Sequence, residues 1–286
     1  MSADRIDPHT HSTVSDGTDT PAQLVAKAAA TGLTAIGLSD HDTVDGWDEA
    51  LAAGERHGIR VLRGIEMSCS KDGVSVHLLA FGCRPQDAEL GAELARIRSG
   101  RSGRVATMSA RLAEAGVPVP HEVLMRQVGD SPSIGRPHFA DAMIELGYVA
   151  SRQEAFDTWL DDDKPGFVPR YSTPLDRGIA LVCAAGGASV IAHPWARSSR
   201  AVLSVEVLTD LVRHGLDGVE VDHNDHDPAT REQLRSPLAA VGALITGSSD
   251  YHGSGKNPDF TLGCNTTDRS VVDELDRRIA ARGGHW

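Results

Sequence analysis

Two histidines near the start of the chain are the first residues whose type and spacing suit metal binding. His9 and His11 end the run Ile6-Asp7-Pro8-His9-Thr10-His11. If the chain is extended here, residues two apart point to the same side, so both imidazoles can face one ion. Neutral imidazole is the commonest metal ligand in proteins. Two surface histidines at this spacing also arise by chance, so the pair needs support from the rest of the chain.

Further acidic and histidine residues stand where an apolar run stops, or inside one. They are Asp16, His41, Glu66, His77, His193, Asp250 and His252. A parallel α/β barrel presents its functional groups at the carboxyl ends of its strands. The pattern therefore predicts that these side chains meet at one end of a barrel. A purely structural purpose is disfavoured, because clustered carboxylates without cations would be costly to bury.

Apolar runs that alternate with amphipathic stretches predict the elements that position these residues. Strands are expected at about 5–7, 33–39, 59–65, 74–81, 188–192, 218–221 and 243–247. Helices are expected at about 22–31, 44–57, 174–185, 205–214 and 228–241. The strand at 59–65 is expected to end on Glu66, since a core strand that continued would favour an aliphatic residue there.

The alternation lapses into a mostly helical pattern in the middle of the chain, as at 90–112 and 136–146. We therefore expect a barrel formed by residues 1–84 and 164–286, with a helical subdomain inserted at 85–163. A chain of 286 residues that is 40% hydrophobic fits one α/β barrel with an insertion better than two small domains.

The charge balance limits the classes of partner. The formal net charge is −12, which argues against binding long nucleic acid through a broad basic surface. The sequence has neither a signal-peptide pattern nor an apolar run long enough to span a membrane. We expect a cytoplasmic protein without a membrane partner.

The joint pattern resembles the polymerase-and-histidinol-phosphatase (PHP) family of metal-dependent phosphoesterases over nearly the whole chain. The resemblance rests on Asp7-Pro8-His9-Thr10-His11, Ser15-Asp16-Gly17, Ser39-Asp40-His41-Asp42, Gly64-Ile65-Glu66, His77, Ala192-His193-Pro194 and Ser249-Asp250-Tyr251-His252. It implies a distorted (β/α)7 barrel of the TIM type that binds two to three divalent transition-metal ions. Mixed imidazole and carboxylate ligands suit manganese, the first choice, with iron or zinc as alternatives.

The resemblance also implies a role for each residue. His9, His11, Glu66 and Asp250 would hold the first ion, and Asp16, His41 and His252 the second. Glu66 would bridge to a third ion held with His77 and His193. Asp7, Asp40 and Asp42 would orient the imidazoles, although Asp42 could equally be a helix N-cap.

The implied reaction is hydrolysis of a phosphate ester by in-line attack of a metal-bridging hydroxide. His193, Asp250 and His252 would be the catalytic residues. His193 is either a ligand of the third ion, which we favour, or the proton donor to the leaving oxygen.

The helical insertion resembles that of the PHP branch that acts on nucleotides. The implied substrates are nucleoside 5′-monophosphates, 3′,5′-bisphosphates or the 5′ ends of short RNA. Arg136, His138 and Lys164 are the candidate substrate-binding residues, since Arg and Lys suit phosphate. Arg136 and Lys164 could equally be solvated, and His138 could instead cap a helix. The stretch Val221-Asp222-His223-Asn224 departs from the family pattern and leaves substrate choice open; His223 and His226 receive no metal role.

Three alternative functions remain open at this stage. The first is a histidinol-phosphate phosphatase of the same family, against which the long insertion weighs. The second is a catalytically silent metal-binding module, which the complete ligand set disfavours. The third is a metal-dependent amide hydrolase, although no lysine at a strand end is suited to carry a bridging carbamate.

Overall fold

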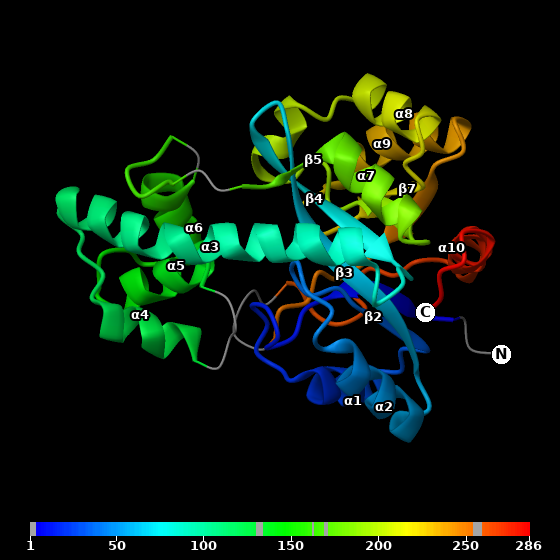
Figure 1. The fold of residues 1–286 in the computed structure, drawn as a ribbon, viewed down its shortest axis with the longest axis horizontal. Helices are drawn as coiled ribbons and strands as arrows, with labels where there is room; N and C mark the ends of the chain where they lie inside the picture. The colour runs from blue at the N-terminus through cyan, green and yellow to red at the C-terminus, as the bar shows by residue number, and fades with distance from the viewer. Residues whose placement is uncertain (1–3, 130–133, 162, 169–170, 254–258) are drawn as a thin grey trace. The chain divides into compact units, whose positions relative to one another are not determined.

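The computed structural model describes residues 4–129, 134–161, 163–168, 171–253 and 259–286. The chain forms two compact units, and the first consists of Met1–Leu94 with Ser172–Trp286. The second unit consists of Ala95–Tyr171. We call them the barrel unit and the insertion unit and describe each by itself (Figure 1).

The barrel unit is a sheet whose strands follow one another in chain order along the path β1-β2-β3-β4-β6-β7-β8. These strands are β1 (Ile6–Thr10), β2 (Ala35–Leu38), β3 (Arg60–Lys71), β4 (Val74–Phe81), β6 (Ala188–Ile191), β7 (Gly218–Asp222) and β8 (Leu244–Gly247). A short strand, β5 (Thr173–Pro174), pairs with β3 beside this path. Backbone hydrogen bonds bring the two ends of the sheet together. They run from Asp250 N to His9 O (3.1 Å) and from His11 N to Tyr251 O (2.8 Å). The predicted (β/α)7 barrel is confirmed.

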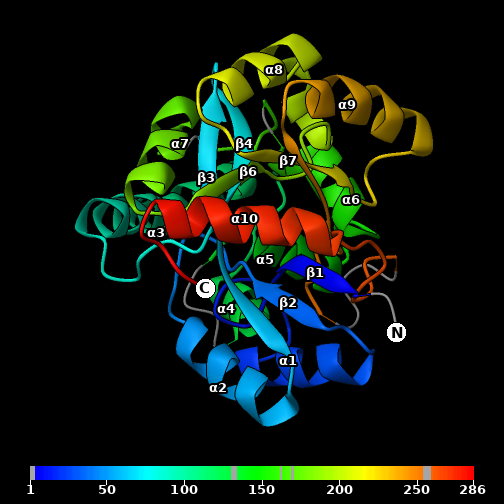
Figure 2. The same ribbon diagram turned by 90° about the vertical axis from the view of Figure 1, so that its right-hand side faces the viewer.

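Helices cover the outside of the sheet (Figure 2). They are α1 (Pro21–Ala30), α2 (Trp47–His57), α7 (Leu175–Ala184), α8 (Val205–Arg213), α9 (Pro228–Ala240) and α10 (Arg269–Ala281). Each predicted barrel helix lies within three residues of an observed one at both ends. Across the described residues, every helix is too short or too polar to cross a bilayer.

Strands β3 and β4 differ from the prediction. β3 continues through Glu66 to Lys71, and β4 pairs with it in the antiparallel direction. Asp72 and Gly73 join them with φ angles of 50° and 82°, the positive values that a two-residue hairpin of type I′ requires. The hairpin places Glu66 and His77 on neighbouring strands at the same end of the barrel. The prediction that this strand ends at Glu66 is therefore wrong.

The insertion unit is helical and has its own apolar core. Its elements are α4 (His121–Val128), α5 (Arg136–Glu145), α6 (Arg152–Ala155) and η1 (Phe156–Leu160), together with the later part of α3 (Ala88–Glu114). The core is built from buried side chains that include Leu112, Leu124, Phe139, Met143 and Leu160.

Candidate metal centre

Imidazole and carboxylate side chains converge at one end of the barrel unit. Three overlapping groups have ligand atoms within 4.8 Å of one another: His9, His11, Glu66 and Asp250; His11, Asp16, His41 and His252; and His41, Glu66 and His77. The first group is the set expected for the first ion. The second contains the expected Asp16, His41 and His252 together with His11.

A local irregularity in β1 presents His9 and His11. The pairing of β1 with β2 shifts register between Asp7 and Thr10, as a β-bulge does. Pro8 lies in this bulge, where the strand pairing needs no backbone N–H donor, so proline is tolerated. Gly37 of β2 lies against it, and a Cβ atom there would sit 1.9 Å from Pro8 O. The two strands can therefore approach this closely only with glycine at position 37. The imidazoles of His9 and His11 face each other, and their Nε2 atoms are 3.1 Å apart.

Glu66 lies at the centre of the cluster and is buried, with 1% of its side chain exposed. Oε2 lies 3.4, 3.1 and 3.2 Å from nitrogens of His9, His11 and His41. Oε1 lies 2.7 and 3.1 Å from nitrogens of His77 and His193. Burial raises the pKa of Glu66, but the neighbouring imidazoles outweigh it and hold the pKa well below its usual range. Glu66 is thus an anion that can bridge two ions.

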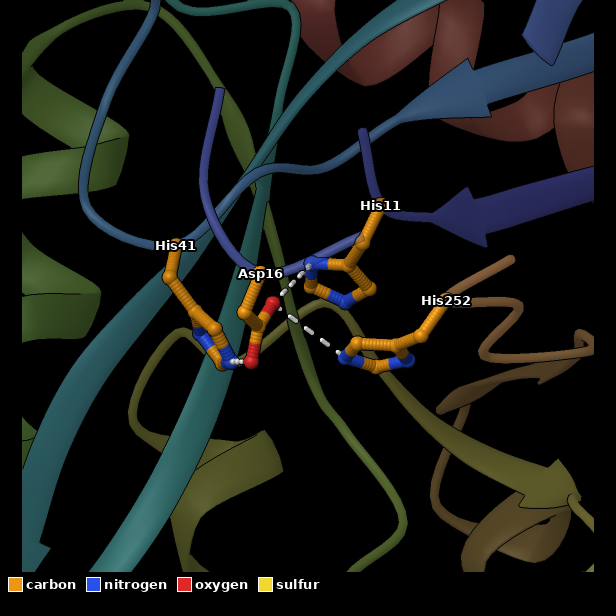
Figure 3. Close-up of side chains that lie close together, drawn as sticks. All are labelled: His11, Asp16, His41 and His252. Carbon is orange, nitrogen blue, oxygen red and sulfur yellow. Dashed lines mark ion pairs between the residues drawn. The ribbon is translucent and has the colours of Figure 1, made fainter. Parts of the chain in front are cut away.

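The second group surrounds Asp16 (Figure 3). Asp16 Oδ1 lies 3.4 Å from His252 Nε2 and 3.8 Å from His11 Nδ1, and Oδ2 lies 3.7 Å from His41 Nε2. The rings of His11 and His252 stack with centroids 4.0 Å apart. Because His11 turns Nε2 toward Glu66 and Nδ1 toward Asp16, it lies between the first and second groups.

The donors of the first group fit a cation. His9 Nδ1 lies 3.1 Å from Glu220 Oε1, and since an ionised carboxylate can only accept, Nδ1 carries the proton. In neutral imidazole Nε2 then bears a lone pair, yet it faces Asp250 Oδ1 at 3.3 Å and Glu66 Oε2 at 3.4 Å. The lone pairs of these nitrogen and oxygen atoms repel one another unless protons or a metal ion lie between them. The mixture of nitrogen and oxygen suits a transition metal.

In the absence of metal, protons occupy this cluster. Burial lowers the pKa of His11, but bonds to Asp250 and Glu66 outweigh it and raise the pKa to about 10. Burial likewise lowers the pKa of His9, and the charge of Glu220 leads the effects that raise it well above its usual range. A metal ion must therefore displace protons when it binds.

His193 lies in the loop after β6 and reaches the same carboxylate as His77. Its Nε2 is 3.1 Å from Glu66 Oε1, and its backbone N–H donates to Glu220 Oε2 at 3.0 Å. Its φ of 25° falls in the left-handed region, an uncommon conformation for a residue other than glycine. His77 and His193, both expected at the third ion, thus face the same oxygen of Glu66, whereas the ligand group that contains Glu66 and His77 has His41 as its third member.

Asp250 is also held in a strained backbone, with φ of 49°. Its Oδ1 lies 3.3 and 3.2 Å from His9 and His11. Asp7 supports this loop, because its carboxylate accepts the N–H groups of Ser249 (3.0 Å) and Gly263 (2.8 Å). Burial raises the pKa of Asp7 to about 6. Asp7 therefore positions backbone, whereas the sequence suggested that it orients an imidazole.

Asp40 acts through serine residues. It accepts from Ser12 N (2.9 Å), Ser12 Oγ (2.6 Å) and Ser15 Oγ (2.6 Å). Ser15 Oγ lies 3.5 Å from His11 Nδ1. Asp40 thus reaches the His11 imidazole indirectly, through the loop that also carries Asp16.

Asp42 binds Ser68 on β3, through Ser68 N (2.6 Å) and Ser68 Oγ (2.8 Å). The N-cap of α2 is Gly46, so the alternative of Asp42 as a helix cap is wrong. This contact joins the loop after β2 to β3 two residues beyond Glu66.

Sequence reasoning gave no role to Glu220, although a carboxylate inside the buried strand at 218–221 was a visible signal. Its side chain is fully buried and hydrogen-bonded to His9.

His223 is also buried, and its Nδ1 accepts the N–H of Asp225 at 3.1 Å. The His223 proton therefore sits on Nε2, which lies 3.4 Å from Asp250 Oδ2. His226 donates from Nδ1 to Val221 O (2.9 Å), and its Nε2 accepts the N–H of Trp195 (3.3 Å), so it joins the loop after β7 to the loop after β6.

The candidate substrate-binding residues lie in the insertion unit. Arg136 Nη1 lies 3.2 Å from Leu160 O and 3.5 Å from Asp161 Oδ1. The guanidinium also lies over the rings of Phe156 and Phe167, at 5.6 and 6.0 Å from their centroids.

His138 caps α5, since its Nδ1 accepts the N–H of Gly135 at 3.0 Å, as the alternative interpretation of this residue proposed. Lys164 is exposed. Both residues belong to the insertion unit, like Arg136.

Comparisons with known proteins agree with these features. A model of the PHP domain matches residues 7–117. The chain is 33% identical to a 3′,5′-nucleoside bisphosphate phosphatase of Chromobacterium violaceum, over 96% of this chain and 97% of that protein. It is 30% identical to a 5′-3′ exoribonuclease of Haemophilus influenzae, over 87% of this chain and 90% of that protein.

A solved structure from Bifidobacterium adolescentis, named for an expected metal-dependent phosphoesterase activity, is also similar. It superposes with a TM-score of 0.88 at 38% identity and covers 96% of both chains.

Proposed function

The chain belongs to the PHP family of metal-dependent phosphoesterases, and on that premise we propose that it hydrolyses phosphate monoesters of small nucleotides. The proposed substrates are nucleoside 5′-monophosphates or 3′,5′-bisphosphates, with the 5′ ends of short RNA as a second class. The observation that carries the proposal is the set of three overlapping ligand groups that share Glu66 and His11 and His41. The bisphosphate phosphatase and exoribonuclease activities of the two relatives support the choice of substrate.

The proposed cofactors are two to three divalent transition-metal ions, manganese first, with iron or zinc as alternatives. His9, His11, Glu66 and Asp250 would hold the first, Asp16, His41 and His252 the second, and Glu66 with His77 and His193 the third. When bound, such ions lower the pKa of a water molecule and neutralise the non-bridging oxygens of a phosphate.

The chain's own residues then orient the reacting groups and move protons. Glu66 keeps the ligand groups together, because its two oxygens face different imidazoles. Asp250 would accept a proton from the attacking water, because its carboxylate lies at the ligand cluster, with Oδ1 3.3 and 3.2 Å from nitrogens of His9 and His11. His193 would join Glu66 and His77 at the third ion, because its Nε2 lies 3.1 Å from Glu66 Oε1; if it bound no ion, its Nε2 would be the proton donor to the leaving oxygen.

We propose that residues 85–163 act as a substrate cap and that Arg136, His138 and Lys164 contact the substrate. The chemistry of Arg136 supports this role, because a planar guanidinium can donate two hydrogen bonds to one phosphate. His138 is buried at the start of α5, where its Nδ1 accepts the N–H of Gly135, next in the chain to Arg136.

The test is a screen of phosphate release with Mn²⁺, Zn²⁺, Fe²⁺ and Mg²⁺. The substrates would be nucleoside monophosphates and bisphosphates, short 5′-phosphorylated RNA, histidinol phosphate and an amide panel. We expect metal-dependent release of phosphate from nucleotides. Turnover of histidinol phosphate alone would move the protein to the histidinol-phosphatase branch, and turnover of amides alone would contradict phosphoesterase activity.

A further inference from the structure

Glu220 joins three separate parts of the metal centre. Its Oε1 accepts the Nδ1–H of His9 at 3.1 Å and the hydroxyl of Ser248. Its Oε2 accepts the backbone N–H of His193 at 3.0 Å. The three donors come from β1, from the loop after β6 and from the residue after β8. One fully buried carboxylate therefore contacts elements far apart in the sequence.

We propose that Glu220 is a positioning residue that fixes the tautomer of His9 and the backbone of His193, and thereby raises the affinity of the centre for its divalent ions. This inference rests on the proposed function, because it concerns the same ions. It adds a residue that binds neither metal nor substrate.

The tautomer of His9 is the first part of the argument. A neutral imidazole can donate its Nε2 lone pair to a metal ion only when its proton is on Nδ1. Glu220 stabilises that arrangement, because it accepts from Nδ1 on the side of the ring opposite to Glu66 and Asp250. Carboxylate partners of this kind also make the imidazole a more basic ligand.

The backbone of His193 is the second part. Its φ of 25° is unfavourable for a residue with a side chain, and such a conformation persists only where the surroundings hold it. The bond from His193 N to Glu220 Oε2 holds it, while Nε2 of the same residue faces Glu66 Oε1. Glu220 thus contacts His9, a ligand proposed for the first ion, and His193, a ligand proposed for the third.

The charge of Glu220 suits this role. Its two oxygens face three donors, the Nδ1–H of His9, the hydroxyl of Ser248 and the backbone N–H of His193, an environment that suits an ionised carboxylate. An anion can accept all three hydrogen bonds at once, whereas a glutamine offers one accepting oxygen and an NH₂ group that would face a donor. Glu220→Gln therefore keeps the volume of the side chain and removes its charge and one of its two acceptor oxygens.

The experiment compares the affinity of the full-length parent, Glu220→Gln and Asp217→Asn for Mn²⁺ alone, by calorimetric titration and competition with a chelator. Asp217 is a matched control, since it precedes the same strand, is 2% exposed, and binds Arg282 at 2.6 Å and Ser189 N at 2.9 Å. Glu220→Gln should weaken Mn²⁺ binding by about 10- to 100-fold, as loss of a partner of a metal ligand does. Asp217→Asn should lower the melting temperature and leave Mn²⁺ affinity unchanged.

A second readout separates positioning from damage to the fold. Excess Mn²⁺ should restore much of the nucleotide turnover of Glu220→Gln, because the missing affinity is offset by concentration. If Glu220→Gln does not fold, Ser248→Ala, which removes one donor to the same carboxylate, should still weaken Mn²⁺ binding by about 2- to 10-fold.

The outcomes that would overturn the inference are distinct from failure of the proposed function. A folded Glu220→Gln, or Ser248→Ala in its place, with the Mn²⁺ affinity of the parent would overturn the inference alone. A parent protein that binds no Mn²⁺, Zn²⁺ or Fe²⁺ would overturn the proposed function and this inference with it.

Discussion

Glu66→Gln should disable the metal centre while preserving the shape of the side chain. The carboxylate oxygens of Glu66 face two sets of imidazoles, with His11 3.1 Å from Oε2 and His77 2.7 Å from Oε1. An amide removes the negative charge from both sides and presents an NH₂ group to one of them. Loss of a partner that only orients a ligand costs about 10- to 100-fold in metal affinity, and loss of a ligand should cost at least as much at each of two ions, so the combined loss at limiting metal should be at least about 10²- to 10⁴-fold.

The assay measures bound manganese by elemental analysis after dialysis, together with kcat/KM for a nucleoside monophosphate at limiting Mn²⁺. Glu93→Gln is the matched control, because Glu93 is a buried carboxylate of the barrel unit, 3% exposed, that binds Thr173 Oγ1 at 2.8 Å. It should retain the manganese content of the parent. Glu66→Gln with the parent's metal content and kcat/KM within a few-fold would refute a bridging role for this carboxylate.

Four further predictions concern metal binding, Asp217, His193 and Arg136. Mn²⁺ at 100 times its dissociation constant should stabilise the protein by about 2.7 kcal/mol and raise the melting temperature by several degrees, whereas a melt unchanged by Mn²⁺ or chelator would contradict metal binding to the native state. Asp217→Asn should cost about 2–3 kcal/mol in denaturant unfolding, because Arg278 and Arg282 lose a buried anion, and a loss under 0.5 kcal/mol would refute that role. His193→Ala should lower metal content and slow nucleotide and p-nitrophenyl phosphate hydrolysis equally if His193 is a ligand; a selective loss on nucleotide, with metal unchanged, would make it the proton donor. Arg136→Ala should reduce kcat/KM for nucleotides by about 10- to 100-fold and spare p-nitrophenyl phosphate, and no loss on either substrate would return Arg136 to a structural role.

Local patterns were sufficient to predict the barrel. Each helix and strand depends on periodicity and on end signals that lie within the element, such as Gly58, which ends α2 with φ of 65°. The strand at 74–81 was predicted, but its antiparallel direction was not, because the polar end of β3 was interpreted as a stop at Glu66. The Asp72-Gly73 pair carried the missing information, since this dipeptide favours a tight hairpin and requires the next strand to reverse direction.

The sequence predicted which residues meet at the metal centre better than it predicted the contacts that hold them there. Glu66 and His77 were candidates because a charged or imidazole group inside an apolar run needs a partner. The contacts of Asp7 and Asp42 depend on the loops that the barrel brings beside them. Asp7, for example, binds Ser249 and Gly263 across more than 240 residues of chain, a separation that no local pattern reports.

Glu220 shows why a ligand set alone understates what the fold contributes. The carboxylate is 211 residues from His9, and the two meet only because the barrel nearly closes and turns both side chains toward its interior. A strand interior that reads Gly-Val-Glu-Val gives the same local signal as one that reads Gly-Ile-Glu-Met, and only the family resemblance singled out Glu66 as a metal ligand. The structure distinguishes them by their partners. Glu66 faces imidazole nitrogens suited to bind metal, whereas Glu220 accepts the proton on the opposite side of His9 and the N–H of His193.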